Sequence, residues 1–169
     1  MLDHPSRPSG LPLILAALPE HHALFHQVSH NPFLMAEGIH INPESLSIDE
    51  LRERAWRVVE PQYEARLTAL IGDFKLAESQ GLGGDELALV AKSAASGRVA
   101  TLLIDSDRQI PGRVNSVTGR IESADLSDPR VDDLLDDVSE LVEKMGGQVV
   151  LLPVERMPGQ MGLAAIYRY

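Results

Sequence analysis

Three histidines recur every fourth residue near the start of the chain, at His22, His26 and His30. On a helix this spacing places the imidazoles on one face, where they could act as zinc ligands in a metal-dependent hydrolase. The pattern lacks the glutamate of an HExxH motif, and His30 stands just before Asn31-Pro32, where we expect the helix to have ended. The plainer interpretation, without a metal, is therefore favoured. We expect no cofactor.

A second candidate is the acidic character of segment 129–145, which we predict to be one helix. The acidic side chains opposite its apolar stripe are Asp132, Asp133, Asp136, Asp137, Glu140 and Glu143. No histidine or backbone cage that would complete a metal site is apparent beside them. The ordinary explanation is a solvated helix face near the positive end of the helix dipole. The functional interpretation that we favour is a docking surface for a basic partner, with Asp132, Asp133, Asp136 and Asp137 in contact with that partner.

Other catalytic motifs are missing from the sequence. The serines form no nucleophile elbow, and the glycines at 81, 83 and 84 precede a helix without the Lys-Ser/Thr of a phosphate-binding P-loop. The chain contains no cysteine, which excludes disulfides, thiolate metal ligands and a cysteine nucleophile. The sequence therefore points away from nucleotide-dependent and thiol chemistry.

The elements that would position such residues centre on the apolar run RVATLLID, residues 98–105. A run of this kind is typical of a strand that is covered on both faces, and we predict it at the centre of a sheet. A helix over 85–96, capped by Gly97, precedes it, and the 129–145 helix follows, begun by Asp128 and Pro129. A second buried run over 149–152 comes next. A crossover helix between two buried strands predicts a parallel pair.

The N-terminal part has a different organisation. We predict a disordered lead over 1–10, and then a buried strand over 11–18 and a helix over 20–29, for which no partner strand is offered nearby. A strand and a helix without partners resemble the end of a larger domain. A connector over 31–47 follows, and the polar stretch 106–128 is predicted to be a surface excursion.

A long helix begins at the capping box formed by Ser47 and Glu50 and ends near residues 81–84. Its apolar stripe is Ile48, Leu51, Ala55, Val59, Tyr63, Leu67, Leu70 and Phe74. Pro61 interrupts the stripe and should kink the helix or split it in two. Trp56 lies off the stripe, so it is a candidate contact with a partner, although local packing explains it equally well.

Composition limits the function further. A chain of 169 residues is long enough for one domain and an appendage. Its net charge of −10 argues against binding nucleic acid by this chain alone, although it does not exclude a local basic patch. No segment approaches the length of a membrane span or a signal peptide, so we expect a soluble cytoplasmic protein without membrane contact.

The C-terminal half carries a family resemblance. GRVATLLID after a helix, a polar excursion, a helix, GGQVVLLPVERMPGQ and the terminal GLAAIYRY resemble the C-terminal domain of the archaeo-eukaryotic release factor and Pelota superfamily. The bacterial branch, family three of the bacterial archaeo-eukaryotic release factor proteins, is the best match. LPLILAALPEHHALF and EGIHINPESLSIDELRERAW resemble the same family, so the likeness extends over nearly everything after residue 10.

This resemblance implies a fold and a domain plan. Residues 48–169 would form a three-layer α/β/α sandwich, like the third domain of release factors and the kink-turn-binding ribosomal proteins. Residues 11–30 would be the last strand and helix of the middle domain, joined by the connector at 31–47. Because almost all of that middle domain is missing here, the family's hydrolytic role does not carry over. The remnant would instead serve packing or dimerisation.

The resemblance makes one motif misleading. Gly146-Gly147-Gln148 spells the tripeptide on which release-factor catalysis depends. Catalysis needs the glutamine on an exposed loop, whereas here the glycines follow a predicted helix and Gln148 opens a predicted strand. We therefore predict a helix cap in place of a catalytic loop.

Three functions remain, in order of preference. The first is a non-enzymatic protein-interaction module of a translation- or ribosome-associated protein, with a protein partner and a possible homo-oligomer through residues 11–29. The second is a module that binds structured RNA, which the fold's relatives suggest and the net charge disfavours. The third is the metal-dependent hydrolase.

Overall fold

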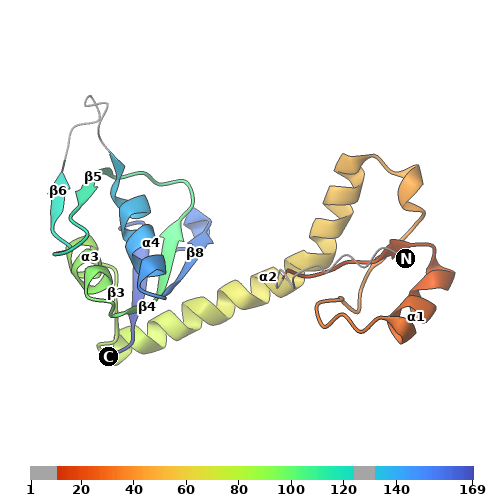
Figure 1. Cartoon of the computed structure of the whole chain (residues 1–169), viewed down its shortest axis with the longest axis horizontal. Coiled ribbons are helices and arrows are strands. Elements are labelled where there is room, and N and C mark those ends of the chain that lie inside the picture. The colour runs from red at the N-terminus through yellow and green to blue at the C-terminus, as the bar shows by residue number, and fades with distance from the viewer. Residues whose placement is uncertain (1–10, 124–131) are drawn as a thin grey trace. The chain divides into compact units, whose positions relative to one another are not determined.

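The computed structural model describes residues 11–123 and 132–169, and it divides into two compact units, Met1–Ala65 and Arg66–Tyr169 (Figure 1). The predicted disordered lead, residues 1–10, lies outside the described residues. Within the described part of the chain, no helix is both long and apolar enough to cross a membrane.

The first unit contains a small parallel sheet. Strand β1 (Ala16–Ala17) pairs with β2 (Ile39–His40), and an isolated bridge joins Leu13 to Leu34. The prediction of a buried strand without a partner over 11–18 was therefore wrong. The segment predicted as a connector folds back and supplies the partner backbone groups, and residues 11–18 are exposed or half-buried. A 3-10 turn, Pro43–Ser45, precedes the long helix.

Helix α1 (Pro19–Val28) confirms the predicted helix and begins one residue earlier, with proline in its first turn. Its face against the small sheet carries the buried His22. Three apolar side chains of α1 instead reach solvent. Leu24 and Val28 are each 62% exposed, and Phe25 is 40% exposed. The apolar surface of α1 is thus largely uncovered in this chain.

Helix α2 (Ile48–Ser79) begins at the predicted capping box. The Ser47 backbone N–H and hydroxyl donate to the Glu50 carboxylate at 2.9 and 2.7 Å, and these bonds lower the pKa of Glu50. Pro61 lies inside the helix and does not split it. Leu67 and Phe74 of the predicted stripe are buried, but Ile48 is 77% exposed because it lies in the first turn.

The second unit is built on a four-stranded sheet in the order β3-β9-β4-β8. Its strands are β3 (Gly83–Gly84), β4 (Val99–Asp105), β8 (Gln148–Leu152) and β9 (Leu163–Tyr167). Strand β4 lies between β9 and β8, and the β4–β8 pair is parallel, so both predictions are confirmed. The prediction that 149–152 is a buried run was wrong in part, because β8 is the outer strand and Leu151 is 60% exposed.

Helices α3 (Leu87–Ala95) and α4 (Leu134–Lys144) pack on the sheet through its main core. Buried members of this core from the helices and β4 include Val90, Leu102, Ile104, Leu135, Val138, Leu141 and Val142. On the opposite side of β4, Leu103 and its neighbour Ala164 are fully buried, so both faces of the strand are covered. The predicted α/β class is confirmed for this unit.

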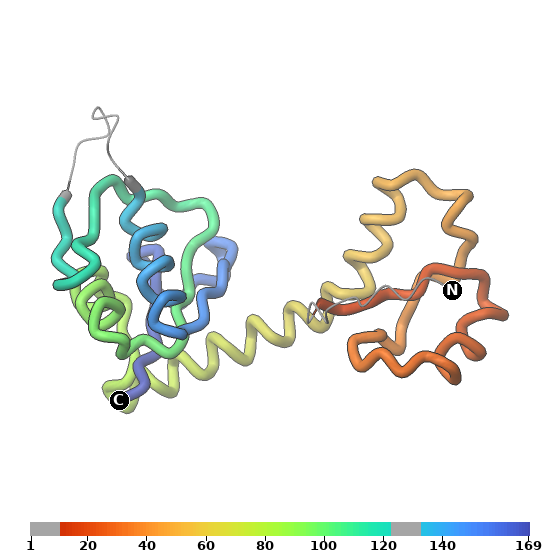
Figure 2. The backbone as a smooth tube through the Cα atoms, viewed as in Figure 1, coloured from red at the N-terminus to blue at the C-terminus, as the bar shows by residue number. Residues whose placement is uncertain are grey.

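The chain ends on the inner strand β9, beside the turn that follows α2 (Figure 2). The Tyr167 N–H donates to the Leu82 carbonyl at 2.8 Å. The Arg98 guanidinium lies over the Tyr167 and Tyr169 rings and donates to the Tyr169 carbonyl at 2.7 Å. Burial raises the pKa of the Tyr167 phenol. The C-terminal end of β9 is thus held by contacts with Leu82 and Arg98.

The predicted surface excursion forms a second sheet. Strands β5 (Pro111–Val114), β6 (Ile121–Ser123) and β7 (Asp132–Asp133) are ordered β6-β5-β7, and β5 packs against α4. Helix α4 accordingly starts at Leu134, with Asp133 as its N-cap. The prediction of a helix from residue 129 was wrong at residues 132 and 133, because Asp132–Asp133 is a strand. The predicted cap at Asp128-Pro129 lies outside the described residues. A 3-10 turn, Val154–Arg156, follows β8.

Candidate interaction surfaces

The histidines serve the first unit's packing. The buried His22 donates from Nε2 to the Ala17 carbonyl at 3.1 Å, and its ring stacks on His40 with centroids 3.9 Å apart. His26 is half-buried and His30 is exposed beyond the end of α1. Across residues 11–123 and 132–169, no group of three acidic or histidine side chains is arranged to hold a metal ion. A zinc centre on these histidines has no geometric support.

Two of the predicted docking carboxylates are used inside the fold. Asp133 accepts hydrogen bonds from the backbone N–H groups of Ile110 and Leu135, both at 3.0 Å. Asp137 accepts a bond from the Val114 N–H at 2.7 Å. These carboxylates attach the second sheet to the start of α4. The interpretation of a fully solvated acidic face is corrected at these two positions.

Three acidic residues on α4 do face solvent: Asp136, Glu140 and Glu143, here called the acidic stripe. They lie four and three residues apart, so they occupy one side of the helix. Glu140 pairs with Lys144 at 3.1 Å, an exposed contact that contributes little to stability. Asp132 belongs to β7, and its side chain lies outside the described part of the structure.

We expect the two kinds of aspartate to respond differently to substitution. Asp133→Ala removes the N-cap and leaves two backbone N–H groups without their acceptor, which should cost about 1–3 kcal/mol. Asp136→Ala should change the free energy of unfolding by less than about 0.5 kcal/mol, because the side chain is exposed. Urea denaturation of both variants checks this. Equal losses would contradict the capping role of Asp133.

Trp56 is 48% exposed on α2, and its ring meets that of Tyr63 with centroids 5.5 Å apart. The indole is therefore packed on one side and free on the other. This geometry fits both interpretations of the sequence, so a partner contact at Trp56 stays a prediction.

The Gly146-Gly147-Gln148 tripeptide joins α4 to β8. Gly146 has a φ of +73° and its N–H donates to the Glu143 carbonyl, as at a helix end. Gly147 has no space for a side chain, since a Cβ atom there would lie 2.6 Å from a Val142 methyl group. Gln148 is exposed but begins β8 and pairs with Thr101. The predicted cap is confirmed.

If the tripeptide is a helix cap, substitution of Gly146 should destabilise the protein more than substitution of Gln148. Gly146→Val forces a branched side chain into a left-handed backbone conformation and should cost about 1–2 kcal/mol. Gln148→Ala removes an exposed side chain and should change stability by less than about 0.5 kcal/mol. Thermal unfolding followed by circular dichroism measures both. A larger loss for Gln148→Ala would contradict this assignment.

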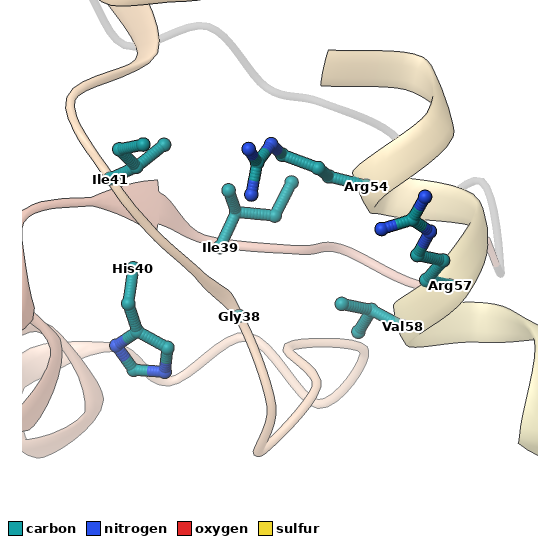
Figure 3. Close-up of a pocket in the computed structure, with 7 residues that line it drawn as sticks. All are labelled: Gly38, Ile39, His40, Ile41, Arg54, Arg57 and Val58. Carbon is teal, nitrogen blue, oxygen red and sulfur yellow. The ribbon is translucent and has the colours of Figure 1, made fainter. Parts of the chain in front are cut away.

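Sequence reasoning missed one feature of the first unit. An open hollow of about 290 Å³ is lined by Gly38, Ile39, His40, Ile41, Arg54, Arg57 and Val58 (Figure 3). The available signal was weak: Arg54 and Arg57 are three residues apart on a helix that also carries Arg52 and Arg66. The residues facing this pair come from a separate segment, 38–41, so the sequence pattern alone does not reveal the site.

The fold is that of a release-factor C-terminal domain. The C-terminal domain of a peptide chain release factor from Methanosarcina mazei matches with a TM-score of 0.57 and 21% identity, over 77% of this chain and 97% of that one. Pelota from Archaeoglobus fulgidus matches with a TM-score of 0.48 and 17% identity, over 94% of this chain and 49% of that one. Dom34 from S. cerevisiae, a translation termination-like factor that interacts with Hbs1, matches with a TM-score of 0.46 and 17% identity, over 89% of this chain and 40% of that one.

The chain belongs to the bacterial archaeo-eukaryotic release factor family 3, whose family model matches residues 1–98. This match confirms the resemblance carried by the sequence. Among curated proteins, none matches this chain. The chain spans nearly all of the Methanosarcina domain but half or less of Pelota and Dom34, so the activities of whole release factors are not assigned to it.

Proposed function

We propose that this chain is a non-enzymatic protein-interaction module of a translation-associated, release-factor-like protein. The observation that carries the proposal is the fold match over 97% of a release-factor C-terminal domain, together with membership of a release factor family. The one tripeptide that could suggest hydrolysis is a helix cap. A domain of this kind would act by contacting another macromolecule rather than by catalysing a reaction.

The acidic stripe on α4 is the surface we assign to that contact. Its three carboxylates are exposed, lie on one side of a helix and take no part in holding the fold together. A basic protein surface would gain complementary charge there, which speeds association and selects the partner. Ribosomal proteins as a class are suitably basic. Asp136 is the member of this stripe that sequence analysis also selected as a contact, and Trp56 stays a second, separate candidate.

The competing functions are tested together. The full chain, incubated with structured RNA that has a 5′-hydroxyl end in a gel-shift assay at low and high salt, should not bind, because its net charge of −10 disfavours broad contact with an RNA backbone. Incubated with peptidyl-tRNA, it should release no peptide. Salt-sensitive RNA shifts would instead favour the RNA-binding alternative. Hydrolysis that disappears in a folded Gln148→Ala variant would overturn the non-enzymatic assignment.

Self-association through residues 11–29 belongs to the same proposal. The exposed side chains of Leu24, Phe25 and Val28 on α1 form an apolar surface that a second copy could cover. Light scattering of the full chain should give a dimer or larger species, and Leu24→Glu with Val28→Glu should give a monomer. A monomer for the unmodified chain would rule this out.

A further inference from the structure

We infer that the hollow between segment 38–41 and helix α2 is a binding site for a phosphate group. Arg54 and Arg57 stand on one side of it, three residues apart on α2. Figure 3 shows both guanidinium groups reaching from the helix toward segment 38–41, with the His40 ring on the other side of that segment. The inference concerns the first unit and goes beyond the protein-interaction role proposed for α4.

The two arginines have donors to spare. Arg54 makes no hydrogen bond or ion pair within the described residues, although its charge helps to lower the pKa of Glu50. Arg57 pairs with Glu53 and its side chain remains 67% exposed. A guanidinium has five N–H donors, so one ion pair leaves most of those of Arg57 available. The hollow therefore presents two cationic groups to a ligand.

The nearest carboxylates on α2 are already engaged. Glu50 accepts bonds from the Ser47 backbone and hydroxyl, and Glu53 holds Arg57. Neither needs the Arg54 guanidinium as a partner. Glu37 lines a separate hollow with Val58 and leaves some negative charge nearby, which should keep the affinity modest.

The geometry favours phosphate over carboxylate. A carboxylate has two oxygens and is satisfied by a single guanidinium in a bidentate pair. A phosphate monoester carries up to two charges and three free oxygens pointing in different directions, so it can accept bonds from two guanidiniums one helical turn apart. At about 290 Å³, the hollow has room for a phosphate with a small attached group.

The walls of the hollow suit that attached group. Ile41 and Val58 are half-buried and form a small apolar surface beside the guanidiniums, whereas Ile39 also lines the hollow but is only 6% exposed. A ribose or base joined to the phosphate could rest on this surface while its charge meets Arg54. The phosphate could belong to a free nucleotide or to an RNA end, and the two sources share this chemistry.

Side-chain NMR of the full chain, labelled with ¹⁵N-arginine, tests the site. Ribose 5-phosphate should shift the Arg54 and Arg57 Nε resonances saturably, while ribose, or sodium chloride at the same ionic strength, should not. Arg54→Gln should weaken binding about tenfold or more. Arg52→Gln is the matched control, because Arg52 lies on the same helix, pairs with Asp49 and does not line the hollow.

A second arm distinguishes the two sources of phosphate. Penta-uridylate with a 5′-phosphate and the same oligonucleotide with a 5′-hydroxyl are compared with ribose 5-phosphate. Arg54-dependent binding of ribose 5-phosphate, with or without the oligonucleotides, supports a free sugar phosphate, and Arg54-dependent binding of the 5′-phosphorylated oligonucleotide alone supports an RNA end. Equal binding of the 5′-phosphate and 5′-hydroxyl oligonucleotides without binding of ribose 5-phosphate would overturn recognition of a phosphate monoester. The inference is overturned if no probe gives saturable shifts, or if Arg54→Gln and Arg52→Gln bind equally well.

Discussion

Leu103→Asp should abolish the fold of the second unit. Leu103 is fully buried on β4, the inner strand between β9 and β8, and the strand is covered on both faces. A carboxylate there would be desolvated without a charge partner, at a cost of about 4 kcal/mol or more. This approaches the whole stability of a small domain. Circular dichroism of the purified variant should show loss of the cooperative unfolding transition of this unit.

The matched control places the same charge on the same sheet. Leu151 on the outer strand β8 is 60% exposed, so Leu151→Asp leaves the new carboxylate in water. Its free energy of unfolding should stay within about 1 kcal/mol of the unmodified protein. Similar losses for the two variants would contradict the strand order described for this sheet.

Gly119→Ala should give the second large loss of stability. Gly119 has a φ of +67°, and a Cβ atom there would lie 2.4 Å from the Lys92 Cα atom and 2.5 Å from the Ala91 carbonyl oxygen. Both obstacles are backbone atoms of α3, so a side-chain rotation cannot relieve the overlap. The left-handed conformation and the overlap together should cost about 2–5 kcal/mol.

Gly81 is the control that separates the cost of the left-handed backbone conformation from the cost of the steric overlap. Its φ is +73°, nearly the same, but a Cβ atom there would meet nothing within 4 Å. Gly81→Ala should therefore show the conformational cost alone, about 1–2 kcal/mol. Urea denaturation of both variants measures the difference. If the two losses are equal, the close approach of the 115–119 turn to α3 is not present in solution.

Much of the second unit could be predicted because its elements carry long, unambiguous patterns. The nearly continuous apolar run at 99–105 is typical of a buried strand, and the apolar spacing over 134–142 is typical of a helix. The start of α4 was misplaced because Asp128-Pro129 and Asp133 are both credible caps. The choice depends on a pairing between Gly112 and Asp132 that no local pattern shows.

The first unit was harder to predict because its strands also depend on long-range pairing that no local pattern shows. Its strands are two residues long, and their pairing joins Ala16 to Ile39 across a helix and a turn. Such short strands have no periodicity of their own. The arginine hollow depends on the same long-range contact, since segment 38–41 must return to meet α2. Asp136 was identified because exposure on a strongly amphipathic helix follows directly from the sequence.

We expect the acidic stripe on α4 to bind a basic, ribosome-associated protein surface. Co-sedimentation of the full chain with purified bacterial ribosomes tests it most directly. The stripe variant carries Asp136→Asn, Glu140→Gln and Glu143→Gln. The control variant carries Glu20→Gln, Glu44→Gln and Glu60→Gln, exposed positions of the first unit. Both variants lose three negative charges, so they have the same net charge.

We expect the unmodified chain and the control variant to pellet with ribosomes to within about twofold of each other, and the stripe variant to pellet about fivefold less. The loss should be smaller at high salt, where the charge contribution is screened. Equal pelleting of the two variants, or no pelleting of the unmodified chain, would contradict a docking role for the acidic stripe.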